Sequence, residues 1–121
     1  MLMKSGVYNM QISNHKLIYV SCKFGGDKKR VEYCENVIKD LIKRDRESGI
    51  NDRIYISPLH TFGWLFNDVP YEEGLDWCLD LLSKCDTMIV LEDFETSRGC
   101  NVEIGYCKAK GIPIVYLNDM I

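Results

Sequence analysis

The sequence predicts an α/β fold, a three-layer sandwich of the flavodoxin-like or Rossmann-like kind built on a parallel sheet of four or five strands. Short apolar runs rich in β-branched residues alternate along the chain with segments whose apolar residues recur at helical spacing. The strand candidates are apolar almost throughout, as strands buried on both faces of a parallel sheet are. Because strand–helix–strand connections are right-handed, this alternation places helices on both faces of the sheet.

The first half of the domain begins with a strand expected over residues 17–22, which a glycine pair ends. A helix is expected from about Val31 to Ser48, where apolar side chains three and four residues apart are separated by charged ones. A second strand covers residues 53–57 and is stopped by Pro58.

The second half repeats the pattern. A long loop is expected over residues 58–71, and a second helix follows over about 75–82. A third strand at 87–91 precedes a helix over about 99–110, which a glycine ends. The last strand is expected at 113–117.

Length and composition fit one globular domain. The chain has 121 residues, of which 46% are hydrophobic and 27% charged. Residues 1–15 form a polar lead-in without a clear period, and the domain is expected over residues 16–121. No apolar run reaches the roughly 20 residues that span a bilayer. The lead-in lacks the apolar core of a signal peptide, so none is expected.

Charge and cysteine usage limit the partners. The net charge of −3, with no basic stripe, disfavours binding to duplex nucleic acid or to an anionic membrane. The six cysteines form no CxxC pair, and three of them fall at apolar positions of predicted helices. We therefore expect reduced thiols in a cytoplasmic protein, with no metal site and no cofactor.

Candidate binding residues gather where the predicted strands end, the edge at which parallel α/β sheets bind ligands. At the third strand, Ser97 is a candidate N-cap and Gly99 lets backbone N–H groups approach an anion. Glu103 lies about one turn into the helix, where an acidic residue is also an ordinary choice because the helix dipole favours it. After the first strand, Gly25 and Gly26 form a glycine pair of the kind that cradles phosphate, although a turn needs glycine in any case.

The long loop and the second helix add further candidates. His60, Phe62 and Trp64 belong to an aromatic loop that could stack on a planar base, or could equally pack on the sheet or on a second subunit. Asp76 and Asp80 lie four residues apart on one helix face. Asp76 is nearer to the ligand edge, because this helix runs antiparallel to the strands. A solvated helix face is the alternative interpretation of both.

Together these features resemble the nucleoside 2-deoxyribosyltransferase-like superfamily over about residues 17–117. The resemblance is strongest at Cys85–Leu91, Ser97-Arg98-Gly99, Glu103 and Lys110–Pro113. Serine at the strand-to-helix turn is similar to the nucleoside 5′-monophosphate N-glycosidases of that superfamily. Within it, the chain is most similar to a compact branch whose members mostly lack an assigned activity.

The resemblance implies a two-carboxylate mechanism. Glu103 would be the nucleophile at C1′ of the sugar, and Tyr19 would orient it. Asp76 or Asp80 would protonate the departing base and then activate water. The spacing of these aspartates does not align cleanly with the position of the family's acid.

The resemblance also implies a phosphate site and a base site. Ser97, Gly99 and the glycine pair would bind the 5′-phosphate, helped by Lys23 or Arg98, with Ser21 at the same edge. The aromatic loop would stack on the base. The glycine pair is offset by about one residue from the family's pattern.

Three functions are compatible with these patterns. The first is a nucleotide N-glycosidase that hydrolyses or transfers the base–sugar bond. The second is a nucleotide-binding or sensing module of the same fold without turnover, and the third is an interaction protein. A homo-oligomer is expected, because a small domain with an aromatic loop leaves apolar surface to cover.

Overall fold

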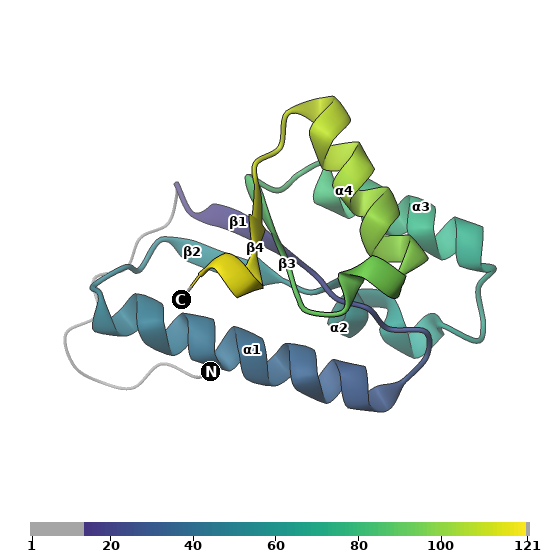
Figure 1. Cartoon of the computed structure of the whole chain (residues 1–121), viewed down its shortest axis with the longest axis horizontal. Helices are drawn as coiled ribbons and strands as arrows, with labels where there is room; N and C mark the ends of the chain where they lie inside the picture. Colours follow the sequence, from purple (N-terminus) through teal and green to yellow (C-terminus); the bar gives the residue numbers. More distant parts are fainter. Residues whose placement is uncertain (1–13, 121) are drawn as a thin grey trace.

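The computed structural model describes residues 14–120 and has a three-layer α/β architecture (Figure 1). Four parallel strands form one sheet in the order β2-β1-β3-β4. The strands are β1 (Lys16–Ser21), β2 (Arg53–Ile56), β3 (Thr87–Val90) and β4 (Ile114–Tyr116). The prediction of a parallel sheet in a Rossmann-like fold is confirmed. The N-terminal lead-in lies almost entirely outside the described residues.

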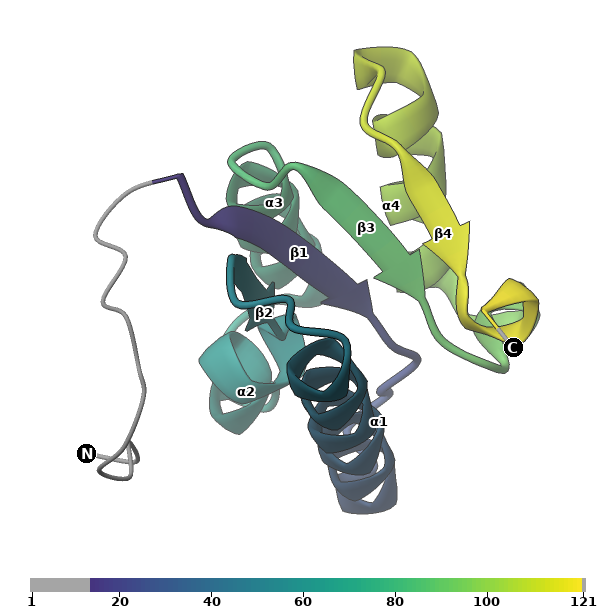
Figure 2. The ribbon, with the colours of Figure 1, turned by 90° about the vertical axis from the view of Figure 1, so that its left-hand side faces the viewer.

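Helices cover both faces of the sheet. They are α1 (Lys28–Glu47), α2 (Pro58–Phe62), α3 (Tyr71–Leu82) and α4 (Arg98–Lys110), with short 3-10 turns at Gly63–Leu65, Phe94–Thr96 and Leu117–Asp119. Figure 2 shows α1 on one face and α3 with α4 on the other. The short helix α2 contacts β1 and α3. No helix among residues 14–120 is both long enough and apolar enough to cross a bilayer.

Alternate residues of β1 contribute to two separate cores, as the two-residue period of a strand requires. Ile18 and Val20 belong to the core beneath α1, which includes Cys34 and Leu41 of that helix. Tyr19 belongs to the opposite core, with buried residues of α3 and α4. All six cysteines are free thiols, and all but Cys78 are buried. The face of β1 that carries Tyr19 is therefore the one that meets α4.

The segment predicted as one long loop is partly helical, so that prediction is wrong over α2 and the 3-10 turn that follows it. Ser57 begins α2, because its side chain accepts a hydrogen bond from the backbone N–H of His60. Pro58 occupies the first helical position, where its fixed φ angle and missing N–H cost nothing. A strand-stopping proline is thus also the start signal of a helix.

The turn between β1 and α1 contains a helix-capping residue and two glycines. Asp27 caps α1, and its carboxylate accepts a hydrogen bond from the backbone N–H of Lys29 at 2.9 Å. Gly25 and Gly26 just before it have φ angles of +60° and +80°. A Cβ atom at Gly26 would lie 2.9 Å from the Phe66 ring. The glycine pair therefore provides both a left-handed turn and a close aromatic contact.

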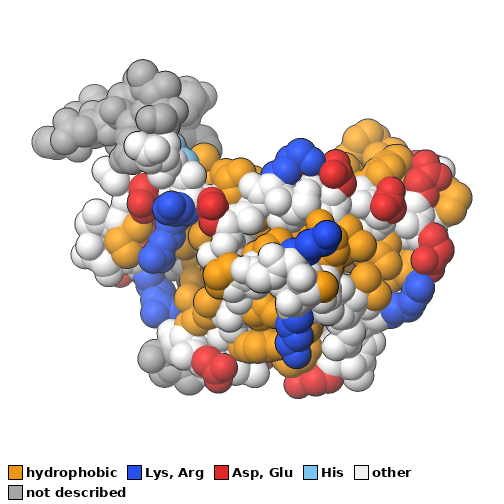
Figure 3. All heavy atoms as spheres, turned by 90° about the horizontal axis from the view of Figure 1, so that it is seen from above, with side chains coloured by type: hydrophobic (Ala, Val, Ile, Leu, Met, Phe, Trp, Pro, Cys, Tyr) orange, Lys and Arg blue, Asp and Glu red, His pale blue; other side chains and the backbone are white. Residues whose placement is uncertain are grey.

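Hydrophobic side chains also reach the surface. Figure 3 shows them across the middle of one face, with acidic and basic side chains distributed around them. Trp64 is the most exposed of the large hydrophobic residues, at 75%. Self-association of the chain stays a prediction.

Replacing Gly26 with alanine is expected to lower the free energy of unfolding by about 1–2 kcal/mol, because the left-handed backbone and the Phe66 contact both oppose a Cβ atom. Gly105→Ala is the matched control, since a Cβ atom at this position within α4 meets nothing within 4 Å. That change should be neutral or stabilising. Denaturant unfolding measures both. Equal stability of Gly26→Ala and the wild type would contradict this interpretation of the turn.

Candidate functional site

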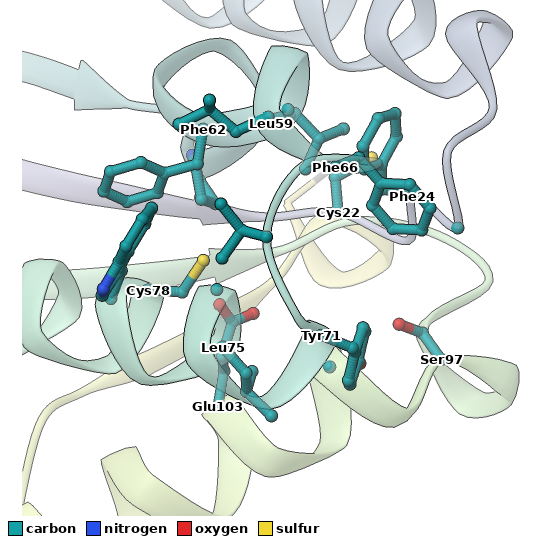
Figure 4. Close-up of a pocket in the computed structure, with 18 of the residues that line it drawn as sticks. Cys22, Phe24, Leu59, Phe62, Phe66, Tyr71, Leu75, Cys78, Ser97 and Glu103 are labelled. Carbon is teal, nitrogen blue, oxygen red and sulfur yellow. The ribbon is translucent and has the colours of Figure 1, made fainter.

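A cavity of about 140 Å³ opens at the carboxyl end of the sheet (Figure 4). Its walls come from the loop after β1, from α2 and the turn after it, from the inward face of α3 and from the first turns of α4. This is the edge at which the sequence placed the ligand site. Chain segments that are far apart in the sequence therefore line one cavity.

Glu103 of α4 is the carboxylate of this cavity. It is only 5% exposed, although it lines the space. The Tyr19 hydroxyl donates a hydrogen bond to its Oε2, and the Ser21 hydroxyl donates one to its Oε1 at 2.6 Å. Tyr19 and Ser21 are two residues apart on β1, so both hydroxyls lie on the face that meets α4. The sheet thus fixes the plane of the carboxylate.

The ionisation of this group reflects two opposing effects. Burial raises the pKa of Glu103, while the hydrogen bonds from Ser21 and Tyr19 favour the charged form and lower it. The pKa of Tyr19 is also raised, first by burial and then by the charge of Glu103. Tyr19 therefore stays protonated and donates to the carboxylate over the physiological pH range. No buried side-chain nitrogen or oxygen within the described part of the chain lacks a partner.

The first turn of α4 forms a second, polar wall. Ser97 caps the helix, accepting a hydrogen bond from the Cys100 backbone N–H at 3.2 Å. Ser97 and Gly99 both line the cavity. The unpaired N–H groups of this turn and the helix dipole favour an anion here. A Cβ atom at Gly99 would lie 3.2 Å from the Tyr71 hydroxyl, so the glycine keeps this approach open.

Aromatic side chains form the third wall. Phe24 and Phe66 pack edge to face with ring centroids 5.2 Å apart. Phe62 and Trp77 form a tilted pair with centroids 5.7 Å apart. In Figure 4, Phe62 lies on the side of the cavity away from Ser97, whereas Phe24 and Phe66 lie nearer to Ser97. The cavity therefore has a polar end at the start of α4 and, across from it, an aromatic end at α2 where Phe62 packs on Trp77.

Half of the predicted site residues gather here. Glu103, Ser97, Gly99, Gly25 and Phe62 line the cavity. Behind Glu103 stand its two hydrogen-bond donors, Tyr19 and Ser21.

Three more predicted residues contact neighbours of the cavity. Gly26 lies close to the Phe66 ring, so that a Cβ atom added at this position would collide with it. The Lys23 ammonium donates to the Thr96 hydroxyl at 2.7 Å. Arg98 pairs with Glu72 of α3, and its guanidinium lies 5.2 Å from the centre of the Tyr71 ring.

The structure does not bring Asp76 or Asp80 to the cavity. Both are exposed, and Asp80 pairs with Lys84 at 3.1 Å. The helical period gives the reason, because the side of α3 that faces the cavity carries Tyr71, Leu75 and Cys78. The aspartates follow these positions by one or two residues and lie on the solvated side, which was the alternative interpretation.

His60 and Trp64 also lie outside the cavity lining. The His60 Nδ1 is 2.8 Å from the Ser57 hydroxyl, and its Nε2 is 3.2 Å from a Glu35 carboxylate oxygen. This places His60 at the start of α2 in a structural role. The Trp64 indole N–H donates to the Thr61 carbonyl, and the ring projects into solvent.

Sequence reasoning missed the contribution of α3. The helical spacing of Leu75 and Cys78 served only to predict the helix, and the structure shows that both side chains line the cavity. Phe24 and Trp77 were not assigned to the site. The available signal was the helical period itself, since Tyr71, Leu75 and Cys78 recur at i, i+4 and i+7. Nothing in the spacing distinguishes a face that fills a core from one that lines a cavity.

Comparison with known proteins identifies the family. The model of a family described as "Domain of unknown function (DUF4406)" matches residues 16–116, and the chain belongs to that family. No match is found among curated proteins. Among solved structures, a 2-desoxiribosyltransferase from Leishmania mexicana is similar, with 19% identity and a TM-score of 0.59. The match covers 84% of this chain and 63% of that one. The predicted deoxyribosyltransferase-like fold is confirmed.

Tyr19→Phe should destabilise the protein in a pH-dependent way. In the folded protein the pKa of Glu103 is raised above its ordinary value of 4.5. The contribution of Glu103 to the free energy of unfolding therefore falls as the pH rises from about 4.5 through the pKa of the folded state. Losing the Tyr19 donor raises that pKa further. The expected loss is about 1–3 kcal/mol at neutral pH and less in acid, where the carboxyl is protonated.

Unfolding by denaturant at several pH values measures this effect. The control is Tyr116→Phe on β4, which removes the hydroxyl of a half-buried tyrosine that makes no hydrogen bond to Glu103. A Tyr19→Phe loss that stays constant across pH would contradict the hydrogen bond to a charged Glu103.

Proposed function

We propose that this DUF4406 protein is a nucleotide N-glycosidase in which Glu103 attacks the sugar. One observation carries the proposal: a buried carboxylate, oriented by two hydroxyls of β1, faces a cavity with a polar end and an aromatic end. The deoxyribosyltransferase-like fold supports it, since a solved structure with this fold is a 2-desoxiribosyltransferase. The bond proposed to break is the one between base and sugar.

In the proposed reaction, an Oε atom of Glu103 forms a bond to C1′ as the C1′–N bond breaks and its electron pair leaves with the base. The product is a glycosyl ester on Glu103. Water then attacks C1′ and releases the sugar, or an acceptor base does so in a transfer reaction. Tyr19 and Ser21 occupy one lone-pair direction on each carboxylate oxygen. They hold the carboxylate plane and leave further lone pairs for the attack.

The polar end suits a 5′-phosphate. Ser97, Gly99 and the start of α4 offer a hydroxyl and backbone N–H groups within the cavity lining. Lys23 and Arg98 lie nearby and add positive charge. The Gly25 backbone completes the lining on the side of β1. The base would then extend from C1′ toward the aromatic end, where Phe62 and its neighbours can stack on a planar ring.

A nucleotide-binding module without turnover is the second candidate. The specific observation in its favour is that Asp76 and Asp80, the two alternative candidates for the acid/base residue, lie on the solvated side of α3. The same polar and aromatic walls would bind a nucleotide in either case.

Glu103→Gln should abolish base release while leaving nucleotide binding intact, because the amide keeps the shape of the side chain and loses the nucleophile. A loss of at least about a thousandfold is expected, as for nucleophile removal in other enzymes. The measurement is chromatography of free base after incubation with ribo- and deoxyribonucleoside 5′-monophosphates, with thermal shift for binding. Glu95→Gln, an exposed residue before α4, is the control.

The outcomes separate the two candidates. Base release by the wild type and by Glu95→Gln, but not by Glu103→Gln, supports the glycosidase. Thermal stabilisation without base release from any nucleotide favours the binding module. Undiminished release by Glu103→Gln contradicts the assignment of the nucleophile.

Gly99→Ala tests the phosphate site. A Cβ atom would crowd the 3.2 Å approach to the Tyr71 hydroxyl and narrow the polar end. The KM for a 5′-monophosphate should rise about tenfold, equivalent to about 1.4 kcal/mol of binding. The KM for the corresponding nucleoside without phosphate should change little, and Gly105→Ala in the same helix should change neither. An equal rise in KM for nucleoside and nucleotide would place the phosphate elsewhere.

A further inference from the structure

We propose that the base of the substrate is a planar cation, joined to C1′ through a pyridinium-type ring nitrogen. This inference rests on the proposed glycosidase function and narrows its substrate class. It follows from two properties of the cavity: the chemistry of its walls, and the groups available to assist the departure of a base.

The walls match an aromatic cation. Rings of Phe24, Phe66, Phe62 and Trp77 border the space in two packed pairs. The negative face of an aromatic ring attracts a cation within about 6 Å, and more strongly when water is excluded. Glu103 adds a carboxylate to the same cavity, at 5% exposure. An organic cation bound here is stabilised by the rings and by the carboxylate together.

A neutral base with polar edges fits these walls less well. Apart from Glu103, Ser97, the Tyr71 hydroxyl and the Trp77 indole N–H, the side chains that line the described cavity offer rings, aliphatic groups or thiols, or are absent at glycine. Discrimination among amino- and keto-substituted bases depends on hydrogen bonds to those substituents. The aromatic end of the described cavity carries no side-chain amide for that purpose. Stacking and charge are the forms of recognition that it provides.

The chemistry of the departing base also favours a cationic substrate. A neutral base that leaves C1′ takes an electron pair and becomes an anion unless an acid protonates it. Among residues 14–120, Glu103 is the cavity's carboxyl group, and residues 1–13 contain no Asp, Glu or His. In the proposed reaction Glu103 is already engaged as the nucleophile. A second carboxyl group to act as the acid is therefore not part of the described cavity.

The remaining proton carriers in the cavity are weak acids. Burial and the charge of Glu103 raise the pKa of the Cys78 thiol to about 11. Burial raises the pKa of Tyr71 as well. Efficient general acids have pKa values near the working pH. These groups are poorly suited to protonate a departing base at neutral pH.

A pyridinium leaving group needs no proton. As the bond from Glu103 to C1′ forms, the C1′–N bond breaks and its electron pair neutralises the ring nitrogen. The base leaves as a neutral heterocycle, and the sugar stays as an ester on the carboxylate. The positive charge that an acid would otherwise supply is already present in the substrate. Electrons and atoms balance without a co-reactant other than the water of the second step.

The experiment compares leaving groups on one sugar phosphate. The whole chain is incubated with nicotinamide mononucleotide as the pyridinium probe, and separately with the 5′-monophosphates of adenosine, cytidine and deoxythymidine. Chromatography measures the free base, and Glu103→Gln controls for release at other sites. We expect kcat/KM for the pyridinium probe to exceed the others by about a hundredfold or more, the usual contribution of a general acid.

The possible results are distinct. Faster release from the pyridinium probe, dependent on Glu103, supports the inference. Glu103-dependent release from a neutral base at an equal or greater rate overturns it and leaves the glycosidase function in place. No release from any of the probes overturns both this inference and the proposed function.

A series of substituted pyridinium ribonucleotides gives a second readout. Without an acid, the rate of the first step should rise steeply as the pKa of the departing pyridine falls. A rate for that step that is independent of the pyridine pKa would overturn the inference.

Discussion

The hydrogen bonds from the Tyr19 and Ser21 hydroxyls to Glu103 are the interaction on which the site depends. They allow a carboxylate to be buried at the junction of the sheet and α4 without losing all of the stabilisation that water would give it. The same contacts join β1 to α4 and set the direction of the carboxylate plane. Burying a carboxylate costs free energy even when hydrogen bonds orient it. Carboxylates with a perturbed pKa and a fixed orientation are therefore found most often at functional sites. One set of contacts thus serves both the structural role of Glu103 and the chemical role proposed for it.

The two ends of the cavity offer different chemical groups. The α4 end, at Ser97 and Gly99, offers backbone donors and a helix dipole for negative charge. The α2 end offers the tilted ring pair of Phe62 and Trp77. In Figure 4, Glu103 lies between Ser97 and Phe62, where a sugar would lie if phosphate and base occupied the two ends. The turn at Gly25 and Gly26 leads from β1 into α1. Its left-handed backbone leaves room for the Phe66 ring.

The sequence predicted the fold and the polar half of the site, because both depend on local signals. Apolar runs indicate buried strands, and a serine and a glycine at a strand-to-helix turn indicate an anion site whatever the neighbouring helices do. Ser21 and Glu103 are expected at one edge of the sheet, because the carboxyl end of β1 and the start of α4 meet there. The role of Tyr19 beside Glu103 is implied by the resemblance to the deoxyribosyltransferase-like superfamily. The aromatic half depends on how α2 and α3 turn toward that edge, which is a matter of tertiary packing. Asp76 and Asp80 show what local signals cannot decide. Each residue turns about 100° further around the helix axis, and this rotation determines whether a carboxylate faces the cavity or the solvent.

The most direct test of the account is to locate the covalent intermediate. A nucleotide with fluorine at C2′ slows both chemical steps, because the substituent destabilises a positively charged transition state at C1′. After incubation of the whole chain with such a substrate and proteolysis, mass spectrometry should find the sugar phosphate as an ester on Glu103. The Glu103→Gln protein should carry no adduct. Base release from the wild type with no adduct at Glu103, or with the sugar on another residue, would contradict the central claim that this carboxylate is the nucleophile.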